Sequence, residues 1–183
     1  LFAYPVRMLR WGPGKDELIL DVDRARLEKA PGFASDNWPD WGVDSYRRAV
    51  DDYFKTDNSV AGPAPQLMRA SELIGTEVQD TRKDDVGEIK DVIVSLGNGK
   101  VLYVVLNLES NKAWSLDHKL MPLPMSALQL SADRKGRAVI TETVANLDKR
   151  RAFDDKDWPD LNDAAYRRDM ESYLAAPKGA ARQ

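Results

Sequence analysis

The residues best suited to chemistry in this 183-residue chain are a single histidine and scattered carboxylates. His118 follows Ser115 and Asp117, which are too close to it in sequence to complete a catalytic triad. We therefore interpret His118 as a loop residue without a catalytic role. Glu88 and Asp91 could form an acid–base pair, but no pattern marks a cleft around them. We expect a chain that is not an enzyme.

Carboxylates are the remaining candidate metal ligands, because the chain has no cysteine and one histidine. Several aspartates cluster near the C-terminal end: Asp154, Asp155, Asp157, Asp160 and Asp163. A calcium-binding EF-hand loop also needs a central glycine and a terminal glutamate, which this spacing lacks. We interpret the cluster as solvated and helix-capping carboxylates, and we expect no metal and no cofactor.

Composition excludes several classes of protein. A hydrophobic content of 43% indicates a folded chain with a real core rather than a disordered one. Lys and Arg number 27 against 30 Asp and Glu, so there is no basic excess to neutralise phosphates, and nucleic acid is an unlikely main partner. No run of about 18 apolar residues exists, so we expect no membrane-spanning segment. Without cysteine, the chain is compatible with an oxidising or a reducing compartment.

An internal repeat organises the sequence. The triplet Trp38-Pro39-Asp40 recurs at residues 158–160, and Tyr46-Arg47-Arg48 recurs at residues 166–168, both with an offset of 120. An offset of 119 maps Pro5 onto Pro124. A period this long predicts duplicated domains.

The repeat sets the predicted domain boundaries. Residues 1–57 are the second half of a first repeat with its helical tail, residues 58–67 are a Pro/Gly/Ala linker, and residues 68–183 are a complete repeat with its helical tail. Residues 68–119 have no counterpart before Leu1. We expect such a segment to precede Leu1, or another molecule to supply it, because an orphaned half-barrel would leave open strand edges.

Short strands joined by tight turns are predicted in the complete repeat. They cover residues 76–80, 86–96, 101–108, 119–123, 127–130 and 137–141. Gly87 marks an expected bulge, and the Gly-Asn-Gly-Lys sequence at 97–100 an expected hairpin turn. Helices are predicted at 24–30, 44–55, 144–151 and 163–175. The predicted fold is mainly β with peripheral α: small β-barrels in tandem, each followed by short helices.

Four motifs of the complete repeat together resemble the PRC-barrel family. They are Leu73-Ile74-Gly75, Gly87-Glu88-Ile89, Gly99-Lys100 and Leu123-Pro124 with the residues around them, over residues 68–142. The tails resemble those of bacterial, exported PRC-barrel proteins. The family's barrel also occurs in the cytoplasmic part of the photosynthetic reaction centre H subunit and in a ribosome maturation factor. This resemblance implies docking onto a larger assembly, no catalytic motif and a periplasmic location, with a cytoplasmic one as the alternative.

The tryptophans are the candidate partner-contact residues: Trp11, Trp38, Trp41, Trp114 and Trp158. For the repeated Trp38 and Trp158 we favour a structural role, in which the ring pins the tail onto the barrel and the Pro-Asp turn leads into a helix. Trp11, Trp41 and Trp114 have no second copy in the chain and are the better candidates for exposed anchors.

The leading functional hypothesis is a non-enzymatic scaffold or adaptor that binds a protein partner or a larger assembly. Homo-oligomerisation is left open. One alternative is a ribosome- or RNA-associated factor, which the family's maturation-factor branch suggests. Another is a binder of small molecules or metal ions in the cell envelope.

Overall fold

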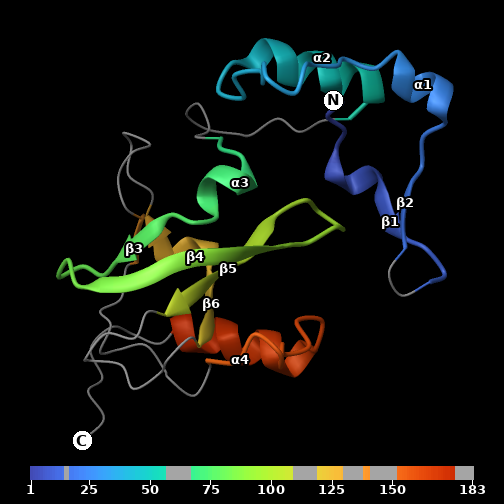
Figure 1. Ribbon diagram of the computed structural model, residues 1–183. Helices are drawn as coiled ribbons and strands as arrows, with labels where there is room; N and C mark the ends of the chain where they lie inside the picture. Colours follow the sequence, from blue (N-terminus) through green and yellow to red (C-terminus); the bar gives the residue numbers. More distant parts are fainter. Residues whose placement is uncertain (15–16, 57–66, 109–118, 130–137, 141–151, 176–183) are drawn as a thin grey trace, which may run out of the picture. The chain divides into compact units, whose positions relative to one another are not determined.

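The computed structural model describes residues 1–14, 17–56, 67–108, 119–129, 138–140 and 152–175 (Figure 1). For residues 171–175 it describes the backbone only. The chain folds as two compact units. The first consists of Leu1–Leu73 and the hairpin tip Ile93–Leu102, and the second of Ile74–Val92 and Tyr103–Gln183.

A curled half-barrel sheet dominates the second unit, as the prediction of a mainly β fold requires. Its strands are β3 (Glu77–Gln79), β4 (Asp85–Val94), β5 (Val101–Leu108), β6 (Leu120–Pro124), β7 (Leu128–Gln129) and β8 (Ala138–Ile140). Their order in the sheet is β6-β5-β4-β3-β8-β7. Strands β3 and β8 pair in parallel, whereas the β3–β4, β5–β6 and β7–β8 pairs are antiparallel. The block β3–β5 is therefore flanked by β6 on one side and by β8 with β7 on the other.

Strand β5 forms the centre of the core. Its apolar run is buried on both faces, since Val104, Val105 and Leu106 are all inaccessible to solvent. Ile89 of β4 and Ile140 of β8 are equally buried. The strand predicted at 101–108 is confirmed to the residue.

The β3–β4 hairpin contains the predicted bulge. Val78 pairs with Gly87 and Gln79 pairs with Asp85, so Val86 is an extra residue on β4. Gly87 has a φ of 141°, a conformation that side chains disfavour. The turn itself is closed by buried Asp80, whose Oδ1 accepts hydrogen bonds from the backbone N–H groups of Arg82 and Asp84 at 2.8 and 3.0 Å.

The first unit has a two-stranded hairpin and helices. Strand β1 (Leu9–Trp11) pairs antiparallel with β2 (Leu18–Leu20) after the 3₁₀ turn η1 (Val6–Met8). Helices α1 (Arg24–Glu28) and α2 (Asp44–Phe54) lie close to the predicted ranges, and a further short helix, α3 (Ala70–Leu73), follows them. The small hydrophobic core of the first unit consists of Ala30, Val50 and Phe54, with Ala3 and Tyr46 packed against it.

Helix α4 (Ala164–Ala175) follows the sheet in the second unit, as predicted. Asp163 caps it, because its Oδ1 accepts a 2.8 Å hydrogen bond from the N–H of Tyr166. The helix predicted at 144–151 lies outside the described residues. Over the described part of the chain, no helix has both the length and the apolar character needed to cross a bilayer.

The two copies of the sequence repeat share their local geometry. Pro5 and Pro124 each precede a 3₁₀ turn, η1 and η2 (Met125–Ala127). The register also recurs: Leu9 pairs with Leu20 in the first copy, and Leu128 with Ile140 in the second. Residues 1–5 therefore correspond to β6, and the β1–β2 hairpin corresponds to β7–β8.

Candidate interaction site

The repeated segments at residues 33–40 and 153–160, here called the tail motifs, place Trp38 and Trp158 in matching environments. The Trp38 ring centroid lies 4.8 Å from that of Phe33 at an interplanar angle of 56°. The Trp158 ring lies 5.0 Å from Phe153 at 59°. Each tryptophan thus packs against a phenylalanine of its own tail. The predicted role, in which the ring pins the tail onto the barrel, stays a prediction.

Local hydrogen bonds fix both indole rings. Nε1 of Trp38 donates to the carbonyl of Ser35 at 3.0 Å, and Nε1 of Trp158 donates to Oδ1 of Asp155 at 3.3 Å. The aspartate of each motif then closes the following turn: the Oδ1 atoms of Asp40 and Asp160 accept from backbone N–H groups at 2.8 and 2.9 Å. The motif is a loop closed by local hydrogen bonds, in which the indole N–H already has a hydrogen-bond acceptor.

Both rings nevertheless remain accessible. Trp38 is 42% exposed and Trp158 38% exposed. Because the polar N–H is satisfied internally, the exposed part of each ring offers apolar and π-face contacts.

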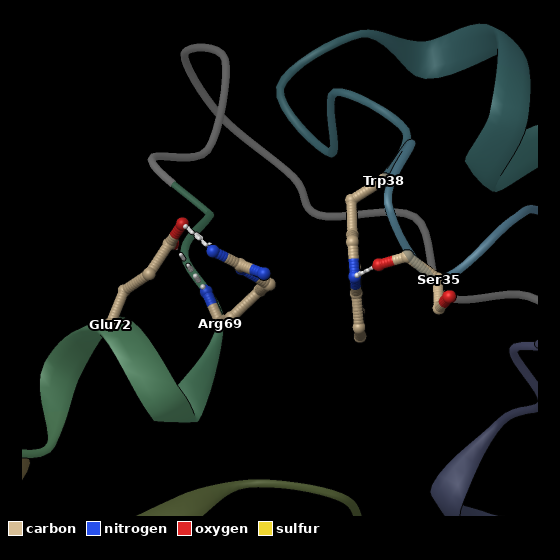
Figure 2. Close-up of polar contacts among 4 residues, drawn as sticks. All are labelled: Ser35, Trp38, Arg69 and Glu72. Atoms are coloured by element: carbon tan, nitrogen blue, oxygen red, sulfur yellow. Dashed lines mark hydrogen bonds and ion pairs between the residues drawn. The ribbon is translucent and has the colours of Figure 1, made fainter.

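The guanidinium of Arg69 packs on the face of the Trp38 ring. The guanidinium carbon of Arg69 lies 4.9 Å from the Trp38 ring centroid, and Figure 2 shows the guanidinium facing the indole. Glu72 holds that guanidinium through an ion pair of 2.7 Å. This contact could not be predicted from the sequence, because Arg69 lies 31 positions after Trp38 and no local pattern links the two residues.

The other candidate tryptophans are placed differently. Trp11 on β1 is 61% exposed. Trp41 is only partly exposed, with edge-on ring contacts to Phe33 at 6.3 Å and to Tyr46 at 5.2 Å. Trp114 lies outside the described residues, as does His118. A partner contact through any of these tryptophans stays a prediction.

Tyr46 connects the aromatic cluster to the backbone. Its hydroxyl donates a 3.0 Å hydrogen bond to the carbonyl of Pro31. Burial raises the pKa of Tyr46, and a backbone hydrogen bond from Ala3 partly opposes that rise.

The carboxylates considered for chemistry have structural partners. Asp154 pairs with Lys119 at 2.6 Å, and Asp91 accepts from the N–H of Val92 at 2.7 Å. Glu88 lies beside Asn107, whose side-chain amide donates to it at 3.5 Å. Within the part of the chain that the structure describes, no three acidic or histidine side chains gather in a way that could hold a metal ion.

The six-stranded sheet, with its bulged β3–β4 hairpin, lies in the part of the chain that is similar to known proteins. Residues 65–147 match the PRC-barrel domain family. The resemblance inferred from sequence is thereby confirmed for this part of the chain, and the curled sheet is consistent with a PRC-type barrel.

Among solved structures, the chain is similar to a protein described as a 16S ribosomal RNA processing protein, RimM, from Pseudomonas aeruginosa. The identity is 18% and the TM-score 0.34, over 46% of this chain. The similarity extends over 50% of the length of that structure. No curated protein matches the sequence.

Proposed function

We propose that this chain is a non-enzymatic protein-interaction scaffold, built from PRC-type barrels in tandem, that binds a protein partner through the tail motifs. The observation that carries the proposal is the exposure of Trp158. This ring is 38% exposed although the six-stranded sheet of its own copy is in place, so missing strands of that sheet do not explain its exposure.

The geometry of the motif specifies what a partner must offer. A hydrogen bond from its N–H and a ring contact with Phe153 position Trp158 within the loop, so we expect a partner to lose little affinity in ordering the ring. Arg69 on Trp38 illustrates the type of group that suits such a ring. A partner of this scaffold therefore presents an arginine or a flat apolar side chain to Trp158.

A crosslinking experiment in the natural host tests the proposal. A photoreactive amino acid at exposed Asp157 leaves Trp158 intact and lies next to it, and the same amino acid at exposed Arg168 serves as the matched control. We expect a protein adduct from position 157 that disappears in Trp158→Ala, with little adduct from 168. With the purified partner, Trp158→Ala should weaken binding about tenfold or more.

Three outcomes would overturn the proposal. They are the absence of an adduct, a protein adduct that persists in Trp158→Ala, and an adduct with RNA instead of protein. The RNA adduct would support the ribosome-associated alternative.

We also propose a periplasmic location, which rests on the resemblance of the tails to exported PRC-barrel proteins. Fractionation of host cells that express the native gene product tests it. Recovery in the periplasmic fraction is expected, and recovery with a cytoplasmic marker would contradict it.

A further inference from the structure

The second copy shows how the halves of a barrel sheet join. The block β3–β5 meets the rest of the sheet at two edges. At one edge β5 pairs antiparallel with β6, with Val104 opposite Leu123 and Leu106 opposite Met121. At the other, β3 pairs in parallel with β8, with Val78 opposite Ala138.

The first copy contains counterparts of β6 and β8, the two strands that border the β3–β5 block in the second copy. Among its described residues it has no counterpart of the β3–β5 block itself. Residues 1–5, here called the N-terminal edge, correspond to β6, and β2 corresponds to β8. Backbone bonds dock the N-terminal edge onto its tail as in the second copy: the N–H of Phe33 donates to Leu1 at 2.9 Å, and that of Phe153 donates to Leu120 at 2.9 Å.

Exposure of side chains follows this difference. Leu1, Phe2 and Tyr4 are 39% to 56% exposed, whereas their counterparts are each 2% exposed: Leu120, Met121 and Leu123. On β2, Leu18 is exposed, while its counterpart Ala138 is fully buried on β8, where it pairs with Val78 of β3. The exposed apolar side chains lie at the positions that a β3–β5 block covers in the second copy.

The backbone hydrogen bonds of the N-terminal edge support the same conclusion. Leu1 bonds to Phe33, and the Ala3 backbone bonds to Tyr46, so both residues direct their polar groups to the tail. Because these groups alternate along an extended segment, Phe2 and Tyr4 direct theirs to the opposite side. In the second copy that is the side on which β5 pairs with β6.

We propose that the N-terminal edge and β2 are the two docking edges for one three-stranded block of the β3–β5 type, carried N-terminal to Leu1 in the same polypeptide. Its last strand runs antiparallel to the N-terminal edge and places apolar residues opposite Phe2 and Tyr4. Its first strand runs parallel to β2. The location in the same polypeptide follows from the second copy, where the block directly precedes β6 in the chain. This inference does not depend on the binding role of the tail motifs.

Backbone hydrogen exchange tests the proposal by comparing the chain that starts at Leu1 with the product of the complete natural reading frame. In the longer product we expect exchange at Phe2, Tyr4 and β2 to slow by about 100-fold or more, independently of protein concentration. Tyr4→Lys in the longer product should abolish this protection at the N-terminal edge and leave α4 protected. Ala34→Lys is the matched control, since it adds the same charge at an exposed tail position.

Four results would overturn the proposal. One is a reading frame without a β-rich segment before Leu1, and a second is equal exchange in both proteins. A third is protection that appears only as concentration rises, which would identify a second copy of the chain as the occupant. The fourth is full protection in Tyr4→Lys.

Discussion

Phe153 and Leu120 exchange two backbone hydrogen bonds, each 2.9 Å long, at the outer edge of β6. Phe153 also supplies the ring against which Trp158 packs. The tail motif thereby covers an edge strand whose polar backbone groups would otherwise be open to pairing with another chain. Leu1 and Phe33 repeat this relationship, with bonds of 2.7 and 2.9 Å.

The contact between Phe153 and Trp158 should contribute measurable coupling energy. A double-mutant cycle with Phe153→Leu and Trp158→Leu should give about 1 kcal/mol in the free energy of unfolding, measured by urea titration, because tilted aromatic pairs gain energy beyond their burial. The cycle at Phe33 and Trp38 should give a similar value, since the ring geometries match. Additive effects in both cycles would show that the rings are merely adjacent.

The repeat provides a natural comparison of helix caps. Asp163 caps α4 with its side chain, whereas Val43 stands at the corresponding position of α2 and makes no side-chain cap. Val43→Asp should therefore raise the free energy of unfolding by about 1 kcal/mol, and Asp163→Ala should lower it by a similar amount. Val43→Ala is the control for loss of the valine side chain. Urea denaturation measures all three, and equal stability of Val43→Asp and Val43→Ala would contradict the prediction.

The fold was predictable where local pattern and burial agree. Strand β5 is an apolar run that follows a Gly-Asn-Gly-Lys turn. Both features can be recognised from residues that are adjacent in the sequence. The bulge at Gly87 was likewise indicated by a glycine within a strand pattern. The repeat predicted the matching tail motifs because the same residues at the same spacing form the same local ring contacts and turns.

The candidate site was predictable only in part. The repeated tryptophan was found from its spacing, but its contact with Phe33 or Phe153, rather than with the barrel itself, depends on the path of the loop. The packing of Arg69 on Trp38 depends on tertiary structure across the linker region, which propensity and periodicity do not encode. The exposed apolar side chains of the N-terminal edge follow from the pairing of whole strands, which only the sheet order reveals.

Tyr46 should make stability fall at alkaline pH. Burial raises its pKa above the usual tyrosine value of about 10, so the folded state retains the phenolic proton at a pH where the unfolded state loses it. The stabilisation is complete below pH 10.0 and is lost as the pH rises through the folded-state pKa. Other tyrosines also titrate there, so the test is the difference in unfolding free energy between the native protein and Tyr46→Phe. That difference should shift in favour of Tyr46→Phe above pH 10, and a constant difference would contradict the assignment.

The contact of Arg69 with Trp38 should stabilise the first unit through charge as well as packing. Arg69→Met retains most of the side chain's length but removes the cation, and we expect a loss of about 0.5–1 kcal/mol in the free energy of unfolding. Part of that loss comes from the ion pair with Glu72, so the decisive measurement is a cycle that combines Arg69→Met with Trp38→Leu. Coupling that survives in Glu72→Gln assigns the energy to the ring. Additivity of Arg69→Met and Trp38→Leu would instead reduce the 4.9 Å approach to simple proximity.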